Sequence, residues 1–550
     1  MREFVETCDA VGATTKRTEK VRLVADLLSK ASRDDAAKMA IFLTGSAFPR
    51  RDERVLGVGS STLSKLVVEL AGPKAQDLGK AYRAHGDLGD AAEKLLTQQN
   101  TNPGISVSNL AQAFDKLPTI RNQADKAAIL DQLIRRATAA EAKYVIKIIT
   151  GDMRIGLKES QVEEAIAKAF DQPLPMVRRA NMLLGDIGET VKLASSNSLE
   201  SADVNLFHPI GFMLATPIEK ASELFPEGNT DSWCVEEKFD GIRAQVHKAD
   251  GKIKFFSRTL DEIVEFPELR NPVSELPGDF ILDGEILAWH DSRPLPFTEL
   301  QKRLGRKQFD LWLHTEIPVR YVVFDLLYQD GQLLLDAPLK ERHERLTNLL
   351  NGLDKTDKTT IALAPMKQCS SAEAIEAAFR ESLAAGHEGV LIKSADSLYT
   401  PGRRGGVWFK LKEPYATLDV VVTAVEYGHG RRHGVLSDYT FSVLDGDRFV
   451  TIGKAYSGLT DAEIKEYTEY FLKHTIKDQG YRRTVEPNIV IEVAFNNIQR
   501  SARHESGYAL RFPRILRFRP DKRPDQIDTL EHVGEIYARQ ITLPRSNKQA

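Results

Sequence analysis

The hydrophobic pattern changes twice along this chain of 550 residues, and these changes limit the folds that it can adopt. As far as about residue 205, apolar residues recur at helical spacing, for example at 21–28 and 127–134. After that point short β-branched and aromatic runs alternate with helical segments, and the last part of the chain is mostly β in pattern. Because one hydrophobic core cannot serve a chain of this length, we predict three domains, at 1–205, 206–415 and 416–550.

The three parts predict three fold classes. The first is all-α, and the weak apolar pattern after Leu193 indicates that the chain passes from this domain into a linker over 184–205. The second is α+β, with strands expected at 253–257, 280–287, 319–326 and 389–393 and helices at 339–350 and 372–385. The third, with about five strands and one helix, suits a small β-barrel of the OB type. Its expected strands are 419–425, 439–444, 449–453 and 488–495, its helix is 461–474, and Asp445-Gly446-Asp447 is a hairpin turn.

Composition excludes several classes of protein. Hydrophobic residues make up 42% of the chain and charged residues 28%, and the net charge of −3 does not indicate a nucleic-acid partner. Cys8, Cys234 and Cys369 are too scattered for a zinc site or a disulfide framework, which fits a reducing compartment. Because there is no apolar run of about 18 residues and no signal peptide, we expect a cytoplasmic protein without membrane contact.

A lysine motif lies at 236–243, with the sequence Glu-Glu-Lys-Phe-Asp-Gly-Ile-Arg. We predict a strand that ends near Lys238, a tight turn at Asp240-Gly241 and a return strand, as in a hairpin. A lysine amine attacks phosphorus only when it is deprotonated, so this lysine needs burial or charged neighbours. Taken alone, the motif fits an ordinary surface hairpin equally well, and the residues that follow decide between the two.

The residues that follow match the needs of nucleotidyl transfer. A triphosphate needs cations, a divalent metal needs carboxylate oxygens, and an adenine ring needs an aromatic side chain on which to stack. Each residue could instead have a purely structural role, in an ion pair, at a core position or on a solvated strand face. Their joint occurrence after Lys238 is therefore what indicates nucleotidyl transfer. The cations are Arg258, Arg404, Lys410 and Lys412, the carboxylates are Glu285 and Glu388, and the aromatic residue is Phe324.

The segment 500–523 is a basic cluster near the end of the chain. Its arginine and lysine residues greatly outnumber Glu505 and Asp521, which predicts contact with phosphates even in a slightly acidic protein. No helix-turn-helix or zinc finger is evident in the sequence. We therefore expect backbone contacts without strong sequence specificity.

An internal resemblance links 54–63 with 153–162, since each segment places an arginine and a glycine just before a predicted helix. Ser60 or Ser61 is expected to cap the first helix, and 158–160 to open the second. Two such helix N-termini could hold two phosphates and grip both strands of a duplex from the minor groove. Ordinary turns between packed helices are the alternative.

Taken in order, these motifs resemble those of the ATP-dependent DNA ligases, which belong to the covalent nucleotidyltransferase superfamily. The likeness covers nearly the whole chain. Its last motif is similar to that of archaeal and cellular replicative ligases, and Arg154-Ile155-Gly156 is similar to a segment of their DNA-binding domain. In the family's order, motif I is 238–243, Ia is 257–258, III is 283–285, IIIa is 321–325, IV is 388–390, V is 408–412 and VI is 511–522.

The resemblance implies a reaction in three steps. Lys238 attacks the α-phosphate of ATP, the AMP passes to the 5′-phosphate of a nick in double-stranded DNA, and the 3′-hydroxyl then displaces AMP. It also implies Mg²⁺, with Mn²⁺ left open, a monomer that is nucleoid-associated in a prokaryote, and an open–closed cycle of the last domain. The implied contacts are adenine for Glu236 and Phe324, ribose for Arg243 and Glu285, phosphates for Arg258, Arg404, Lys410 and Lys412, the metal for Glu285 and Glu388, and pyrophosphate for Arg519, Asp521 and Lys522.

Three alternatives remain beside this family. An NAD-dependent ligase needs a four-cysteine zinc site, which three scattered cysteines cannot supply. An RNA ligase or a capping-type guanylyltransferase shares the lysine motif, but the helical first part and the segment 511–514 argue against both. An inactive DNA-binding scaffold disagrees with the presence of the lysine and carboxylate set. Neither the pathway nor a recruiting partner such as a sliding clamp follows from the sequence.

Overall fold

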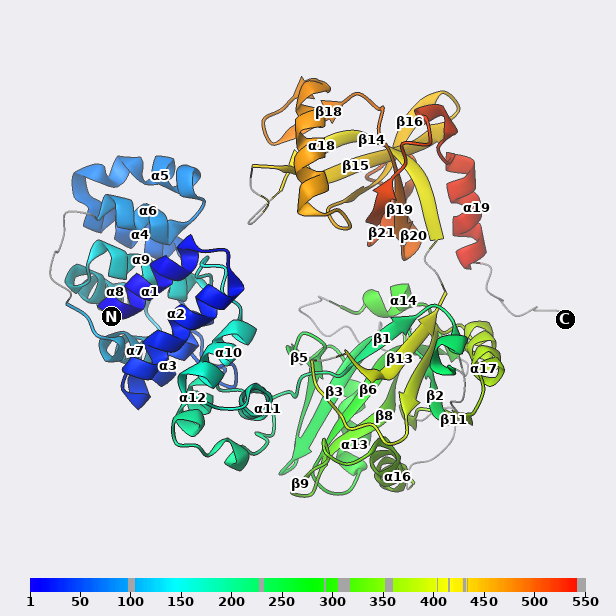
Figure 1. Ribbon diagram of the computed structural model, residues 1–550, viewed down its shortest axis with the longest axis horizontal. Coiled ribbons are helices and arrows are strands. Elements are labelled where there is room, and N and C mark those ends of the chain that lie inside the picture. The colour runs from blue at the N-terminus through cyan, green and yellow to red at the C-terminus, as the bar shows by residue number, and fades with distance from the viewer. Residues whose placement is uncertain are drawn as a thin grey trace. The chain divides into compact units, whose positions relative to one another are not determined.

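The computed structural model describes residues 1–96, 104–226, 232–290, 293–304, 317–351, 360–402, 404–413, 416–428, 432 and 434–541 (Figure 1). Two compact units divide the chain, one of residues 1–218, 222–375 and 391–410 and the other of residues 219–221, 376–390 and 411–550. Among the helices in the described ranges, none has the length and apolar character needed to cross a membrane.

The first region of the chain is helical, as its apolar spacing predicts, and the predicted segments 21–28 and 127–134 lie inside two of its helices (Figure 1). Aromatic residues meet edge to face in its core, where the ring of Phe42 lies 6.4 Å from that of Phe4 and 5.7 Å from that of Phe114. The helices are α1 (Arg2–Ala13), α2 (Arg17–Lys30), α3 (Arg33–Leu43), α4 (Ser60–Ala71), α5 (Leu78–His85), α6 (Leu88–Leu95), α7 (Val107–Lys116), α8 (Gln123–Arg136), α9 (Ala139–Thr150), α10 (Glu159–Ala169), α11 (Leu174–Leu184) and α12 (Ile187–Ser195).

The helix α12 falls in the stretch that the sequence assigns to a linker, so that prediction is wrong as far as Ser195. Ile187, Val191 and Ala194 are buried on one face of this helix. A stripe of three residues is too short to stand out against the polar residues around it, and packing against the neighbouring helices decides the structure.

Two sheets form the next region, and all four predicted strands and both predicted helices are confirmed within it. The smaller sheet has the order β1 (Leu214–Ile218), β13 (Arg404–Lys412), β12 (Gly389–Ser394), β2 (Trp233–Lys238), β11 (Met366–Cys369). The larger sheet has the order β10 (Ile361–Leu363), β8 (Val319–Gln329), β6 (Phe280–His290), β3 (Ile242–Ala249), β4 (Lys252–Ser257), β5 (Glu262–Ile263), with β7 (Arg293–Pro294) on β6 and β9 (Gln332–Leu333) on β8. The described helices are α13 (Arg270–Glu275), α14 (Phe297–Gln301), α16 (Leu339–Leu350) and α17 (Ala372–Ala384).

His247 on β3 is a buried histidine that ties the larger sheet to the segment before β1. Its Nδ1 accepts the N–H of Phe207 at 3.0 Å, and its Nε2 lies 2.8 Å from Oε1 of Gln245, so the ring is neutral with its proton on Nε2. Burial, with a smaller contribution from His208, lowers the pKa of His247 to about 3.

We expect the free energy of unfolding to fall as the pH drops below about 6.5, because the unfolded chain then binds a proton that folded His247 does not bind until the pH nears 3. One such histidine contributes a slope of about 1.4 kcal/mol per pH unit within that window. Urea unfolding at a series of pH values would measure the slope. A His247→Gln variant, which keeps hydrogen-bonding groups, should show a shallower slope, and equal slopes would contradict the assignment.

A C-terminal sheet domain follows, and its long first strand is shared by three partners. Along its length β14 (Ala416–Tyr427) pairs with β15 (Leu436–Asp445), β18 (Arg482–Val485) and β19 (Val490–Phe495), an arrangement that suits the predicted small barrel. The predicted hairpin is confirmed, since β15 pairs with β16 (Arg448–Ala455) around Gly446-Asp447. The remaining elements are α18 (Asp461–Lys473), β17 (Thr475–Asp478), β20 (Asn497–Arg500), β21 (Tyr508–Arg511), β22 (Arg514–Phe518) and α19 (Leu530–Ile541).

The estimate of about five strands and one helix is wrong for this domain. The sequence analysis missed the short strands β17, β18, β20, β21 and β22 and the helix α19. Most of these strands are four residues long and rich in charge, so they lack the apolar alternation that marks a strand, and non-local pairing forms them.

Candidate active site

Lys238 is the last residue of β2, as predicted, but the prediction of a hairpin is wrong. In the smaller sheet β2 lies between β12 and β11, whereas β3 pairs with β4 and β6 in the larger sheet. The chain crosses between the sheets at Gly241, where a Cβ atom would lie 2.3 Å from the carbonyl oxygen of Ile286. Only glycine permits this approach, so Lys238 stands where the chain passes from one sheet to the other.

Glu236 and Lys393 form a buried ion pair two residues before the lysine. The two residues lie on β2 and β12, neighbours in the sheet, with Oε2 of Glu236 2.5 Å from Nζ of Lys393 and only 2% and 0% of the side chains exposed. Burial raises the pKa of Glu236, and the charge of Lys393 opposes that rise. The other oxygen, Oε1, is also buried and has no hydrogen-bond partner among the residues that the structure describes.

Phe324 lies beside this ion pair, on β8. Its ring centroid is 4.8 Å from Nζ of Lys393 and 5.4 Å from the guanidinium carbon of Arg243. It packs in one cluster with Phe239, the residue directly after Lys238, and this contact anchors the end of β2. The structure thus brings together four residues that the sequence singled out, Glu236, Lys238, Arg243 and Phe324.

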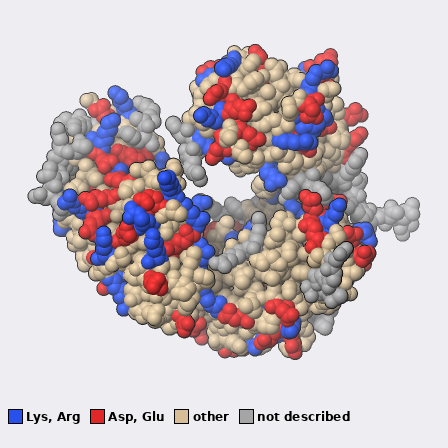
Figure 2. All heavy atoms as spheres, in the orientation of Figure 1, with Lys and Arg blue, Asp and Glu red and all other residues tan. Residues whose placement is uncertain are grey.

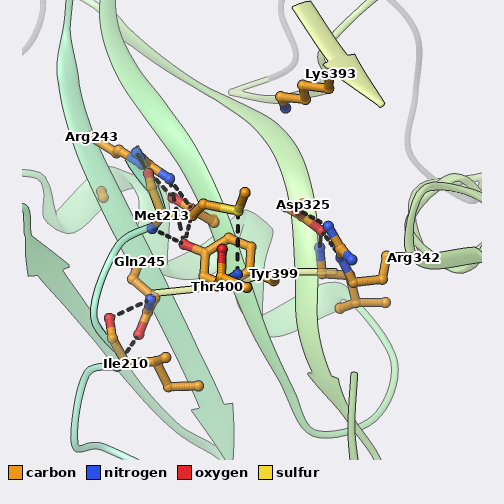
Figure 3. A network of polar contacts seen from close by, with 12 residues as sticks. Ile210, Met213, Arg243, Gln245, Asp325, Arg342, Lys393, Tyr399 and Thr400 are labelled. Carbon is orange, nitrogen blue, oxygen red and sulfur yellow. Dashed lines mark hydrogen bonds and ion pairs between the residues drawn. The ribbon is translucent and has the colours of Figure 1, made fainter. Parts of the chain in front are cut away.

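Arg243 is held by a network of buried polar groups (Figure 3). Its guanidinium donates to both carboxylate oxygens of Asp283, at 3.1 and 2.7 Å, and to the carbonyl of Met213 at 2.8 Å. The hydroxyl of Tyr399 donates to Asp283 at 2.8 Å and accepts the N–H of Met213 at 3.1 Å. Burial opposes the charge of Arg243, but Asp283 more than offsets it, and the pKa of Arg243 is raised.

The remaining predicted phosphate-binding cations lie on two elements. Arg258 is exposed on the tight turn after β4, in which the N–H of Leu260 donates to the carbonyl of Ser257 at 2.8 Å. Lys410 and Lys412 are partly buried on β13, and strand alternation places them on the same face as Trp408. Arg404 begins β13, and its side chain lies outside the described residues.

Of the two predicted metal ligands, one lies within a strand and the other directly before one. Glu285 on β6 is partly exposed and lies opposite Arg243 in the register with β3, and Glu388, also partly exposed, directly precedes β12. Within the described part of the chain, no group of three histidine, cysteine, aspartate or glutamate residues could hold a metal ion. Mg²⁺ takes one or two carboxylates together with substrate phosphates, so a carboxylate of this kind suits an ion that arrives with a nucleotide.

The predicted pyrophosphate-binding residues form a compact charge cluster in the second unit. Arg519 pairs with Asp419 at 2.8 Å and with Asp521 at 2.7 Å, and Nζ of Lys522 lies 2.5 Å from Oδ2 of Asp419. The hydrogen bond from Arg519 lowers the pKa of Asp521 to about 2. Asp419 was not predicted as a site residue, although an acid within the apolar run 418–422 was a usable signal.

The two similar segments of the helical region each place a glycine with a positive φ angle before a helix. Gly57 and Gly156 have φ angles of +62° and +61°, and α4 and α10 begin a few residues after them. The predicted serine cap of α4 is wrong, because Gly59 occupies the cap position without a side-chain hydrogen bond and Ser60 is the first helical residue. The second helix opens at Lys158, as predicted.

A buried lysine from the opposite half of the helical region closes each turn. Lys126 on α8 donates to the carbonyl of Leu56 at 2.6 Å, and Lys20 on α2 donates to the carbonyl of Ile155 at 2.5 Å and that of Gly156 at 3.0 Å. Only 5% of Lys126 and 6% of Lys20 is exposed. Each half of the helical region therefore supplies a buried lysine that donates to the turn of the other half, so both turns are fixed by the same kind of hydrogen bond.

Surface charge is mixed rather than segregated. On the face shown in Figure 2, lysine and arginine side chains are interspersed with aspartate and glutamate over the helical region. This agrees with the small net charge of −3, so attraction to a polyanion has to come from local groups of cations.

Lys393, Asp283 and Tyr399 complete the site, and the sequence analysis assigned them no role. Lys393 ends an apolar run on β12, and Asp283 stands inside an apolar strand, so both carried the signal of a charge that needs a buried partner. Tyr399 carried no comparable signal, because only the fold brings it next to Asp283.

Family models match three parts of the chain. They are described as DNA ligase N terminus, over residues 1–167, ATP dependent DNA ligase domain, over residues 212–412, and ATP dependent DNA ligase C terminal region, over residues 432–522. A solved structure named Pmar-Lig_PreS3 shares the fold, with a TM-score of 0.58 and 17% identity over 94% of this chain and 99% of that one.

Two curated relatives match over almost their full lengths. The "Probable DNA ligase" of Koribacter versatilis is 49% identical over 98% of this chain and 97% of its own. The "DNA ligase" of Methanoculleus marisnigri is 34% identical over 98% of each chain. Such identity over a whole chain is characteristic of a single family. The chain therefore belongs to the ATP-dependent DNA ligase family.

Proposed function

We propose that this enzyme uses ATP to seal nicks in double-stranded DNA, with AMP carried on Lys238 between the two substrates. In the first step the neutral amine of Lys238 attacks the α-phosphorus of ATP, an N–P bond forms, pyrophosphate leaves, and the nitrogen gives up a proton. The 5′-phosphate at the nick then attacks the phosphorus of the AMP, and Lys238 departs as the amine. Finally the 3′-hydroxyl attacks the activated 5′-phosphorus, loses its proton and displaces AMP.

Cations of the site would neutralise the phosphates in these steps. Arg258, Lys410 and Lys412 are the candidates, with Arg404 beside them in sequence, because positioned cations stabilise the charge that develops during phosphoryl transfer. Glu285 and Glu388 would hold Mg²⁺, or Mn²⁺ in its place. The ion would supply further neutralisation of the triphosphate.

The unsatisfied oxygen of Glu236 is the observation that carries the proposal. A buried carboxylate oxygen without a partner is costly, and a ligand that donates a hydrogen bond removes that cost. The exocyclic amine of adenine is such a donor, whereas guanine presents a carbonyl oxygen at the same place. Phe324 would stack on the base, and Arg243 with Glu285 would contact the ribose.

The test is to incubate the protein with α-labelled ATP or α-labelled GTP, strip free nucleotide by denaturation, and then add nicked duplex to a parallel native sample. We expect label on the protein from ATP only, followed by its transfer to the 5′-phosphate of the nick. Label from GTP would favour a capping-type guanylyltransferase, and transfer to nicked RNA but not DNA would favour an RNA ligase. Neither alternative is favoured at present, since the relatives are DNA ligases.

The paired turns of the helical region would contact the duplex. Both precede a helix N-terminus, where free N–H groups attract phosphate, and equivalent contacts with Lys20 and Lys126 support them. Two similar turns suit the two similar strands of a duplex, so we propose that each turn holds one backbone.

A Gly156→Ala substitution should weaken binding of nicked duplex about tenfold, or about 1.4 kcal/mol, and leave labelling by ATP unchanged. Gly156 has a φ of +61°, and an added Cβ would lie 2.9 Å from Nζ of Lys20, so the lysine has to move and its hydrogen bonds to the turn are disturbed. Gly72→Ala is the matched control, because φ there is +55° and an added Cβ meets nothing within 4 Å. Titration of a labelled duplex measures both. Equal affinities for the two variants would argue against a DNA contact at this turn.

A further inference from the structure

Asp419 is a nearly buried carboxylate that binds two cations at once. It lies on β14 between the buried Leu418 and Val420, and 11% of its side chain is exposed. Nη1 of Arg519 donates to Oδ1 and Oδ2 at 2.8 and 2.9 Å, and Nζ of Lys522 donates to Oδ2 at 2.5 Å. One side chain therefore brings together the charged ends of two residues that stand three positions apart.

The backbone around Asp419 is fixed independently of these cations. The N–H of Asp419 donates to Oδ2 of Asp528 at 2.7 Å, and the N–H of Asp528 donates to the carbonyl of Asp419 at 2.9 Å. On the other side, the N–H of Arg519 donates to the carbonyl of Val490 at 2.9 Å. Both partners of the ion pair are thus tied to the same sheet, so the carboxylate is a rigid acceptor.

Asp521 also binds Arg519, but in a different setting. It lies two residues along the chain, with 60% of its side chain exposed, whereas Asp419 comes from a strand distant in sequence. Asp521 binds Nε and Nη2 of Arg519, whereas Asp419 binds both Arg519 and Lys522. Asp419 is therefore the carboxylate that couples the positions of the two cations.

We propose that Asp419 is a positioning residue for the first step of the reaction. It holds Arg519 and Lys522 with their charged ends converging, so that the two can bind the β- and γ-phosphates of ATP together as the bond to the α-phosphate breaks. Arginine and lysine side chains have much rotational freedom, and a pair fixed in advance binds an anion with a smaller loss of entropy. The inference rests on the proposed role of Arg519 and Lys522 toward pyrophosphate.

The variant Asp419→Asn tests this, since asparagine keeps the shape of the side chain and removes its charge. We expect the single-turnover rate of label transfer from α-labelled ATP to Lys238 to fall at least tenfold. Removal of AMP from the labelled protein by added pyrophosphate, which is the reverse of the same step, should fall by a similar factor. Sealing of a nick that already carries 5′-AMP should stay within twofold of the wild type, because no pyrophosphate takes part in it.

Glu426→Gln is the matched control, as it removes a carboxylate from the same strand whose partner is Lys454. It should leave all three rates near those of the wild type. If Asp419→Asn slows the sealing of the pre-adenylated nick as much as the first step, Asp419 supports the fold alone and the proposal is overturned. A wild-type rate for the first step overturns it as well.

Arg519→Ala separates this inference from the function on which it rests. A slow first step in Arg519→Ala together with a normal one in Asp419→Asn would overturn the positioning role and leave the pyrophosphate role standing. A normal first step in Arg519→Ala would overturn the pyrophosphate role, and the proposal for Asp419 would fall with it.

Discussion

We expect a Lys238→Ala variant to take up no detectable label from α-labelled ATP under conditions in which the wild-type protein becomes labelled. The substitution removes the amine that is proposed to attack the α-phosphorus, so the covalent intermediate should not form, and an alanine offers no substitute nucleophile. Denaturing electrophoresis after incubation measures the label. Wild-type protein has to be stripped of bound AMP with pyrophosphate beforehand, since an occupied lysine cannot react again.

Lys252→Ala is the control for this experiment, because Lys252 is an exposed lysine at the start of β4. It should label as fully as the wild type. The Lys238→Ala variant should still seal a nick that already carries 5′-AMP, since the nucleophile of that step is the 3′-hydroxyl. Persistent label on Lys238→Ala would place the nucleophile on another residue and contradict the proposed mechanism.

Local pattern was sufficient for the long elements of the fold. Helices such as α2 and α8 carry apolar residues at helical spacing, and strands such as β6 and β8 are apolar runs that contain β-branched and aromatic residues, so their type follows from local sequence. The family resemblance rests on the same local information, because each motif is a short run of residues. These parts of the structure were predictable from the sequence.

Pairing between distant segments was not predictable in the same way. The stretch from Trp233 to His247 has the composition of a hairpin, yet β2 and β3 join different sheets, because the register of β3 with β6 outweighs a local turn. The short strands after residue 474 exist only through their partners. Such pairings depend on residues dozens of positions away, which no window along the chain contains.

The residues of the candidate site fall into the same two groups, those that a local motif identifies and those that only the fold brings into contact. Lys238, Glu236, Arg243 and Phe324 were found by motif and lie together in the structure. Their buried partners were not assigned, because a partner is defined by three-dimensional contact. Lys393, Asp283 and Asp419 each stand in an apolar strand, and the rule that a buried charge needs a counter-charge would have flagged all three without naming what they bind.

The largest effect on stability is expected from a Lys393→Met substitution. It would leave Glu236, 2% exposed, as a carboxylate without its counter-charge. Breaking a buried ion pair by removing one partner costs about 3–5 kcal/mol, so we expect the free energy of unfolding to fall by that amount near pH 8. Lys340→Met is the matched control, since its pair with Asp396 is largely exposed and should contribute less than about 1 kcal/mol.

The pH dependence of this loss distinguishes a buried charge from a packing defect. Burial raises the pKa of Glu236, and without Lys393 that rise should be larger. A raised carboxyl pKa contributes stability that is present at low pH and is lost as the pH rises through the folded pKa. The difference in unfolding free energy between wild type and Lys393→Met should therefore shrink between about pH 8 and pH 5, by up to about 1.4 kcal/mol per pH unit.

A Glu236→Gln, Lys393→Met double variant completes the cycle. It has no buried charge at this position, so its unfolding free energy should exceed that of Lys393→Met alone and should not depend on pH through this site. Urea unfolding at several pH values measures the wild type, Lys393→Met, Glu236→Gln and the double variant. The loss of unfolding free energy in Lys393→Met could instead be independent of pH, or Glu236→Gln could fail to reduce it. Either result would mean that the ammonium group fills space beside Phe324 and does not balance the charge of Glu236. Recovery in the double variant would instead show that Lys393 stabilises the charged form of Glu236, the form that the proposed hydrogen bond to adenine requires.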